Sequence, residues 1–161
     1  VGTLFTVYLP FRSVKSEDDQ DLDNTECECC GVIPEGLKVL VVDDCETNQA
    51  VAAGLLRACD VEVVLADSGE AALKQCQQDD FDLVLLDIRM PGLDGFEVLK
   101  MIRQDPDLSD HPVYMVSGSE EPSDMAMARE AGANGYLTKP GSVSGYGQLA
   151  KTIDKNVFGI K

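Results

Sequence analysis

The feature that most constrains the fold is a regular alternation of short apolar segments with segments of helical character from residue 37 onward. The apolar segments span 37–42, 61–65, 81–86, 112–116 and 135–137, and the helical segments span 47–58, 68–78, 95–103, 123–131 and 146–156. Strands that are apolar throughout and joined by helices form parallel sheets covered on both faces, with right-handed crossovers. The sequence therefore predicts an α/β fold, a doubly wound (βα)₅ three-layer sandwich with a five-stranded parallel sheet.

Residues 1–35 differ from the rest of the chain. Residues 1–10 alternate between two faces and end at Pro10, which is typical of a strand. Residues 16–28 hold seven acidic side chains, no basic one and a single aliphatic one, so this segment cannot bury enough surface to fold. We expect a strand remnant over 1–12, an acidic linker over 13–35 and a folded domain over 36–161.

The charge of the chain excludes several classes of partner. Lys and Arg number 13 against 29 Asp and Glu, which gives a net charge of −16. Affinity for nucleic acids and anionic membranes comes largely from basic side chains, so we expect neither nucleic acid binding nor direct membrane contact. The sequence lacks an apolar run of about 18 residues and a signal peptide. We expect a cytoplasmic domain excised from a longer protein. A membrane anchor, if the parent chain has one, would lie outside this sequence.

Six cysteines raise the possibility of disulfides or a zinc site. Three of them crowd into 27–30, and the other three lie in or beside periodic segments. The crowded group has no second ligand pair, and the chain has one histidine, so zinc is disfavoured. Free thiols in a reducing compartment are the simpler interpretation.

Polar residues follow four of the predicted strands. Asp43 and Asp44 follow the first strand, Asp87 the third, Ser117 the fourth and Lys139 the fifth. The carboxyl ends of parallel strands meet at one edge of the sheet, where ligands bind in this architecture. Clustered carboxylates repel one another unless a cation joins them, and carboxylate oxygens suit Mg²⁺. The metal, the ammonium and the hydroxyl together would hold a phosphoryl group.

These strand-end residues lie in four short motifs. The motifs are VVDDCETN at 41–48, LDIRMPGLDG at 86–95, Ser-Gly at 117–118 and YLTKP at 136–140. In this order, and at these strand ends, they resemble the response-regulator receiver domains of two-component signalling. The resemblance spans 37–157 and implies a flavodoxin-like fold.

The resemblance implies a role for each residue of the cluster. Asp87 would accept a phosphoryl group from a phosphohistidine. Asp44, Asp87 and the main-chain carbonyl of Arg89 would ligate Mg²⁺ or Mn²⁺, and Asp43 would act through water. Lys139 would pair with the bound phosphoryl oxygen.

Further residues would control signalling and the lifetime of the phosphate. By the same resemblance, Ser117 and Tyr136 form a switch pair. Arg89 and Ser119 stand at positions that modulate the slow self-dephosphorylation of receivers. We also expect the Arg89 side chain to lie over the acidic pocket and partly shield it.

The first ten residues carry a second resemblance. The segment GTLFTVYLP at 2–10 is similar to the last strand of a histidine-kinase ATPase domain. Kinase, linker and receiver in this order imply a hybrid histidine kinase, a phosphotransferase. The partner would be a histidine-phosphotransfer domain or the kinase's own dimerisation and phosphohistidine domain.

The helix predicted over 47–58 is apolar nearly all round, more than is needed to cover a sheet. We expect Ala50, Val51 and Gly54, with Pro140 beside them, to contact the helical partner. The alternative is that these small side chains pack inward and leave little surface exposed.

Three other functions compete with phosphoacceptance. A flavodoxin-like FMN carrier needs a Gly-, Ser- or Thr-rich phosphate loop, and the acidic 43–46 segment would repel phosphate. An aspartate-nucleophile hydrolase needs a second carboxylate where Arg89 stands. A receiver-like docking module that is never phosphorylated stays open.

Overall fold

The computed structural model of the chain describes residues 36–58 and 60–139. The strand predicted over 1–10, the acidic linker, the helix predicted over 146–156 and Pro140 lie outside these residues. The described elements follow one another in the predicted order. They are β1 (Lys38–Val42), α1 (Glu46–Arg57), β2 (Glu62–Ala66), α2 (Gly69–Gln78), β3 (Leu83–Asp87), α3 (Gly95–Gln104), β4 (Val113–Ser117), α4 (Pro122–Glu130) and β5 (Gly135–Thr138).

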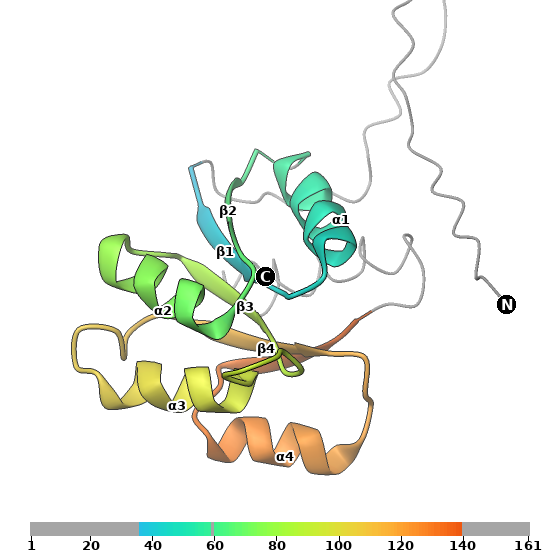
Figure 1. Cartoon of the computed structure of the whole chain (residues 1–161), viewed down its shortest axis with the longest axis vertical. Coiled ribbons are helices and arrows are strands. Elements are labelled where there is room, and N and C mark those ends of the chain that lie inside the picture. The colour runs from blue at the N-terminus through green and yellow to red at the C-terminus, as the bar shows by residue number, and fades with distance from the viewer. Residues whose placement is uncertain (1–35, 59, 140–161) are drawn as a thin grey trace, which may run out of the picture.

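The strands form one parallel sheet in the order β2-β1-β3-β4-β5. The predicted doubly wound α/β fold with five parallel strands is therefore confirmed. The strand order reverses direction between β1 and β3, which both continue into loops at the same edge of the sheet (Figure 1). This reversal point is where doubly wound folds bind their ligands.

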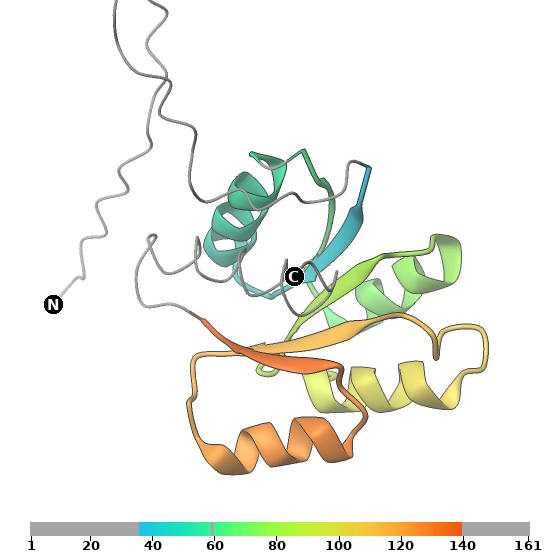
Figure 2. The ribbon, with the colours of Figure 1, turned by 180° about the vertical axis from the view of Figure 1, so that it is seen from behind.

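The two faces of the sheet are covered separately. Alternate residues of β1 face opposite sides, so Leu40 and Val42 belong to one apolar cluster and Val39 and Val41 to another. The first cluster packs against α2, α3 and α4, and the second against α1. Figures 1 and 2 show α1 on one side of the sheet and α3 and α4 on the other.

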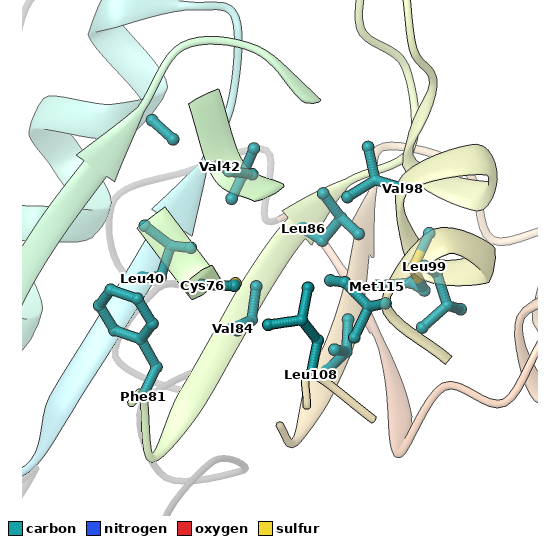
Figure 3. Packing of buried hydrophobic residues seen from close by; sticks show 14 of the residues in the cluster. Leu40, Val42, Cys76, Phe81, Val84, Leu86, Val98, Leu99, Leu108 and Met115 are labelled. Atoms are coloured by element: carbon teal, nitrogen blue, oxygen red, sulfur yellow. The ribbon is translucent and has the colours of Figure 1, made fainter. Parts of the chain in front are cut away.

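The larger cluster fixes the central strands. Leu86 of β3 and Met115 of β4 are fully buried and meet Val98 and Leu99 of α3 (Figure 3). Burying each such side chain contributes roughly 1.5–3 kcal/mol. Since β3 is anchored along its whole length, its last residue, Asp87, has a fixed position.

Element ends and edge strands differ in detail from the prediction. Most boundaries lie within one or two residues of the predicted ones. The strand β2 lies at the edge of the sheet and is only partly buried, with Leu65 37% exposed, although its sequence is that of a buried strand. Ser68, predicted as the first residue of its helix, is the N-cap of α2, and its hydroxyl accepts a hydrogen bond from the N–H of Ala71 at 3.3 Å.

Candidate functional site

Three carboxylates meet where β1 and β3 end. Asp43 and Asp44 follow β1, Asp87 ends β3, and the two strands are hydrogen-bonded neighbours with Val42 opposite Leu86. One oxygen from each carboxylate lies within 4.8 Å of the others. Asp43 and Asp87 are each 5% exposed, whereas Asp44 is exposed. The structure thus brings the three predicted carboxylates together.

The ammonium of Lys139 joins two of these carboxylates. Its Nζ lies 2.6 Å from Oδ2 of Asp43 and 3.0 Å from Oδ2 of Asp87. The main-chain N–H of Lys139 donates to the carbonyl of Ser117, which ties the residue after β5 to the end of β4. Burial alone would lower the pKa of Lys139, but its bonds to the two carboxylates outweigh burial and raise it. Lys139 is therefore a fixed positive charge.

Asp87 sits in an environment that disfavours its charge. Burial raises the pKa of its carboxyl above the ordinary 3.8, Lys139 opposes the rise, and the negative charge of Asp43 adds to it. Its Oδ1 accepts a long hydrogen bond of 3.4 Å from the N–H of Arg89. The Arg89 peptide therefore lies beside the cluster. Within the described part of the chain, the exposed Arg89 side chain makes no ion pair, so the expected shielding is not seen as a contact.

Asp43 is held by the first turn of α1. Its Oδ1 accepts from the N–H of Cys45 at 2.9 Å, and the Nδ2 of Asn48 lies 3.2 Å from both of its oxygens. The neighbouring amide of Gln49 donates to the main-chain carbonyls of Asp43 and Ala66. Sequence reasoning missed both amides. The available signal was two adjacent amide side chains one helical turn after an acidic strand end.

The donor set fits a divalent cation. Carboxylate oxygens are hard ligands, and they are the ligands that Mg²⁺ and Mn²⁺ take in proteins. Among residues 36–58 and 60–139, Asp44 has no hydrogen-bond or ion-pair partner, so its oxygens are free to ligate. Asp87 also has spare acceptor capacity beyond Lys139 and Arg89.

Ser117, Ser119 and Tyr136 form a connected group beside the carboxylates. The Oγ of Ser117, which is 2% exposed, accepts from the N–H of Ser119 at 3.1 Å. The hydroxyl of Tyr136 donates to the carbonyl of Ser119 at 2.8 Å. The ring of Tyr136 is half-buried and packs against the larger cluster. The predicted switch pair is thus linked through the Ser119 main chain.

Gly95 is a site-positioning residue that the sequence did not single out. It begins α3, and its N–H donates to the carbonyl of Ile88 at 2.9 Å. A Cβ atom here would lie 2.3 Å from the main-chain oxygen of Asp87. The start of α3 therefore lies directly against the peptide that carries the buried carboxylate. Asp94 and Glu97 secure this start with a reciprocal capping box.

The expected docking residues lie on the helix next to the site. Ala50 and Gly54 are exposed on α1, and Val51 is half-buried. A Cβ atom on Gly54 would meet nothing within 4 Å. In the part of the chain that the structure describes, no helix is both long and apolar enough to cross a bilayer.

Comparisons with known proteins agree on one family. The family model described as response regulator receiver domain matches residues 39–152. The chemotaxis protein CheY-3 of Vibrio cholerae is 36% identical over 125 residues, which cover 77% of this chain and 94% of CheY-3.

Solved structures give the same result. The Mn²⁺-bound form of response regulator Rcp1 is similar with a TM-score of 0.65 and 29% identity, over 74% of this chain and 92% of that one. The phosphorylated cyanobacterial phytochrome response regulator RcpA is similar with a TM-score of 0.69 and 29% identity, over 76% of this chain and 94% of that one.

Proposed function

The chain belongs to the response regulator receiver domain family and serves two-component signalling, and we propose that its phosphoryl acceptor is Asp87. One observation carries the assignment. Asp87 is the buried carboxylate that ends the central strand β3, with an ammonium 3.0 Å away and two further carboxylates beside it. In the described residues this arrangement occurs at one place, the reversal point of the sheet.

The proposed reaction is an in-line transfer from a phosphohistidine. A carboxylate oxygen of Asp87 attacks phosphorus, the new O–P bond forms as the N–P bond breaks, and the imidazole leaves with the electron pair. Lys139 pairs with an oxygen of the transferred group. The fixed main chain around Asp87 holds the attacking oxygen in place, which is the main contribution a protein makes to such a transfer.

We assign the divalent ion to Asp44 and Asp87, with the Arg89 carbonyl as a further ligand and Asp43 acting through water. Asp44 and Asp87 have acceptor capacity to spare, as described above. When bound, Mg²⁺ or Mn²⁺ offsets negative charge on the phosphoryl oxygens and so stabilises the transition state. The Mn²⁺-bound form of Rcp1 supports this choice of ion.

The signalling state is assigned to the Ser117 and Tyr136 pair. The Ser117 hydroxyl would turn toward the phosphoryl group, and the hydrogen bond from Tyr136 to Ser119 would respond, since Ser119 contacts both residues. Arg89 and Ser119, whose main-chain N–H groups contact Asp87 and Ser117, are assigned to control of hydrolysis. Phosphorylation shifts the equilibrium between the two states only by as much as it stabilises one of them more than the other.

The wider context is a hybrid histidine kinase in the cytoplasm. Residues 1–12 are assigned to the last strand of a kinase ATPase domain, 13–35 to a linker and 36–161 to the receiver. The phosphohistidine would come from a histidine-phosphotransfer domain or from the kinase's own dimerisation domain. The domain that carries the phosphohistidine would dock on Ala50, Val51, Gly54 and Pro140. A coding sequence without a kinase ATPase domain before Val1 would contradict this context.

Labelling with a small phosphodonor tests the acceptor. The chain is incubated with acetyl phosphate and Mg²⁺, and its intact mass is compared with that of Asp87→Asn and of Asp80→Asn. Asp80 is an exposed aspartate remote from the site and serves as a charge-matched control. We expect one phosphate on the wild type and on Asp80→Asn, and none on Asp87→Asn or without the metal. No adduct, while titration shows that Mg²⁺ binds, would favour the unphosphorylated docking module instead.

A further inference from the structure

We propose that Asn48 is a positioning residue that keeps the Asp43 carboxylate oriented when Lys139 turns from Asp43 to the phosphoryl group. This inference rests on the proposed function, because it concerns the same site. It assigns a task to an amide on α1 that neither carries charge nor belongs to the carboxylate cluster.

The Asp43 carboxylate is held by three protein donors. Its Oδ1 accepts from the N–H of Cys45 at 2.9 Å and from Asn48 at 3.2 Å. Its Oδ2 accepts from Asn48 at 3.2 Å and from Lys139 at 2.6 Å. A carboxylate offers about four acceptor positions, and these three donors take up most of them. Asp43 is therefore fixed by three donors, of which one is charged.

The proposed reaction removes the charged donor, the ammonium of Lys139, from Asp43. Lys139 is shared between Asp43 and Asp87, at 2.6 and 3.0 Å, so its ammonium is committed to neither carboxylate alone. Once the ammonium pairs with a phosphoryl oxygen on Asp87, one acceptor position of Asp43 Oδ2 becomes free. Asp43 is only 5% exposed, and a buried carboxylate that loses donors is costly unless other hydrogen bonds hold it.

Two donors from the described residues then remain, and of these Asn48 alone reaches both oxygens. The N–H of Cys45 contacts Oδ1 alone, so it supplies no donor to the Oδ2 that Lys139 leaves. The Nδ2 of Asn48 lies 3.2 Å from both oxygens, so it still donates to the side of the carboxylate that Lys139 leaves and keeps Oδ2 hydrogen-bonded. Gln49, the next residue, ties this turn of α1 to the main-chain carbonyls of Asp43 and Ala66. The amide of Asn48 is thus presented from a turn that is itself anchored to β1 and β2.

A double-mutant cycle separates positioning from general support of the fold. The Kd for Mn²⁺ is measured by calorimetric titration for the wild type, Asn48→Ala, Lys139→Met and the double variant. Asn134→Ala serves as the matched control in both backgrounds. Its amide is also a structural hydrogen-bond partner, to Arg103 and to the N–H of Val113, but it precedes β5 at the opposite edge of the sheet.

With Lys139 present, we expect Asn48→Ala to raise the Kd for Mn²⁺ by about threefold, because two donors still hold Asp43. In the Lys139→Met background the same change should raise the Kd by about tenfold or more. Asn134→Ala should leave the Kd unchanged in both. If the double variant fails to fold by circular dichroism, Asn48→Ser, which keeps one donor, replaces Asn48→Ala and the ratio between backgrounds is compared again.

Two results would overturn the positioning role. One is the same factor, or no change, in both backgrounds, and the other is an equal loss of affinity in Asn134→Ala. If the wild type binds Mn²⁺ and takes up phosphate on Asp87, either result rejects the positioning role of Asn48 and leaves the proposed function standing. A wild type that binds no Mn²⁺ and takes up no phosphate rejects the proposed function and this inference together.

Discussion

Alanine substitution at two helical glycines should change the stability of the domain in opposite directions. One glycine touches the main chain of the site, and the other faces open space. A Cβ at Gly95 would lie 2.3 Å from the Asp87 oxygen and 2.9 Å from Cα of Ile88. Both contacts are to main chain that cannot move without shifting β3. We expect Gly95→Ala to lower the free energy of unfolding by about 3 kcal/mol, as measured by urea denaturation.

Gly54→Ala is the matched control. Gly54 lies in the middle of α1 with nothing within 4 Å of an added Cβ, so only helix propensity changes. We expect this variant to gain about 0.5–1 kcal/mol. Equal effects of the two substitutions would mean that the close approach of α3 to Asp87 does not constrain the fold.

The raised pKa of Asp87 predicts a pH dependence of the metal-free domain. Burial, together with the charge of Asp43, keeps a proton on native Asp87 at pH values where the unfolded side chain, with an ordinary pKa of 3.8, has lost it. The stability that Asp87 contributes is therefore complete below about pH 4 and is lost as the pH rises through the native pKa. Asp87→Asn has no such proton, so its stability relative to the wild type should increase over that range.

Urea midpoints of the wild type and Asp87→Asn, followed upward from pH 4 with a chelator present, measure this difference. Asp44→Asn, at the exposed member of the cluster, is the control for removing one negative charge. A stability difference between Asp87→Asn and the wild type that stays constant or shrinks with rising pH would show that Lys139 outweighs burial at Asp87.

At the scale of the elements, one side chain ties α3 to two loops at the edge of the sheet away from the site. The guanidinium of Arg103 donates from Nε to the Gly132 carbonyl at 2.8 Å and from Nη2 to Oδ1 of Asn134 at 2.8 Å. Its Nη1 donates to the carbonyls of Ser109 and His111. A lysine ammonium cannot reproduce this planar set of donors. Arg103 therefore holds the loops before β4 and β5 in place.

We expect Arg103→Lys to cost about 2 kcal/mol of unfolding free energy, because several main-chain and amide acceptors lose their donor. Amide hydrogen exchange should rise in the α4–β5 connection more than in β1. Arg129→Lys, on the exposed last turn of α4, should stay within about 0.5 kcal/mol of the wild type. A uniform rise in exchange across the sheet would mean that Arg103 supports the fold globally and not these loops.

The order and type of the described elements were predictable from the sequence, because each apolar run and each helical period is a local pattern. The residues at which the elements begin and end were less predictable. The pattern predicts Phe81 as the first residue of a strand, but Phe81 lies in the connection before β3. There the Nζ of Lys38 is 5.5 Å from the centre of the Phe81 ring. The partial exposure of β2 follows from its place at the sheet edge, and strand order is not a local property.

At the scale of the whole molecule, the candidate site was predictable as far as it consists of strand ends. Asp43, Asp87 and Lys139 converge because parallel strands bring their carboxyl ends to one edge, a consequence of topology alone. Asn48 was not predictable, because which face of α1 meets Asp43 depends on how the helix is rotated on the sheet. The exposed side chain of Arg89 shows the same limit, since a position beside Asp87 in sequence does not fix where a long side chain points.

The chain carries a large excess of negative charge. A divalent ion therefore acts in two ways, by screening the charge of the whole chain and by binding at the site. Any Mg²⁺ screens a net charge of −16 to some extent, whereas a bound ion stabilises the native state by mass action. At a concentration of about 100 Kd, specific binding adds about 2.7 kcal/mol to the free energy of unfolding. Screening depends on total charge, and specific binding depends on Asp44 and its neighbours.

Removing one negative charge, either at Asp44 or at Asp80, separates screening from specific binding of the ion. We expect Mg²⁺ to raise the urea midpoint of the wild type and of Asp80→Asn alike, and to raise that of Asp44→Asn by much less. Both variants have one negative charge fewer, but Asp80 lies among acidic residues at the end of α2, away from the carboxylate cluster. Ca²⁺ and Mn²⁺ at equal ionic strength extend the comparison, since screening by divalent ions is the same for all three. Equal increments in Asp44→Asn and Asp80→Asn would assign the whole effect to screening and leave the carboxylate cluster without a metal.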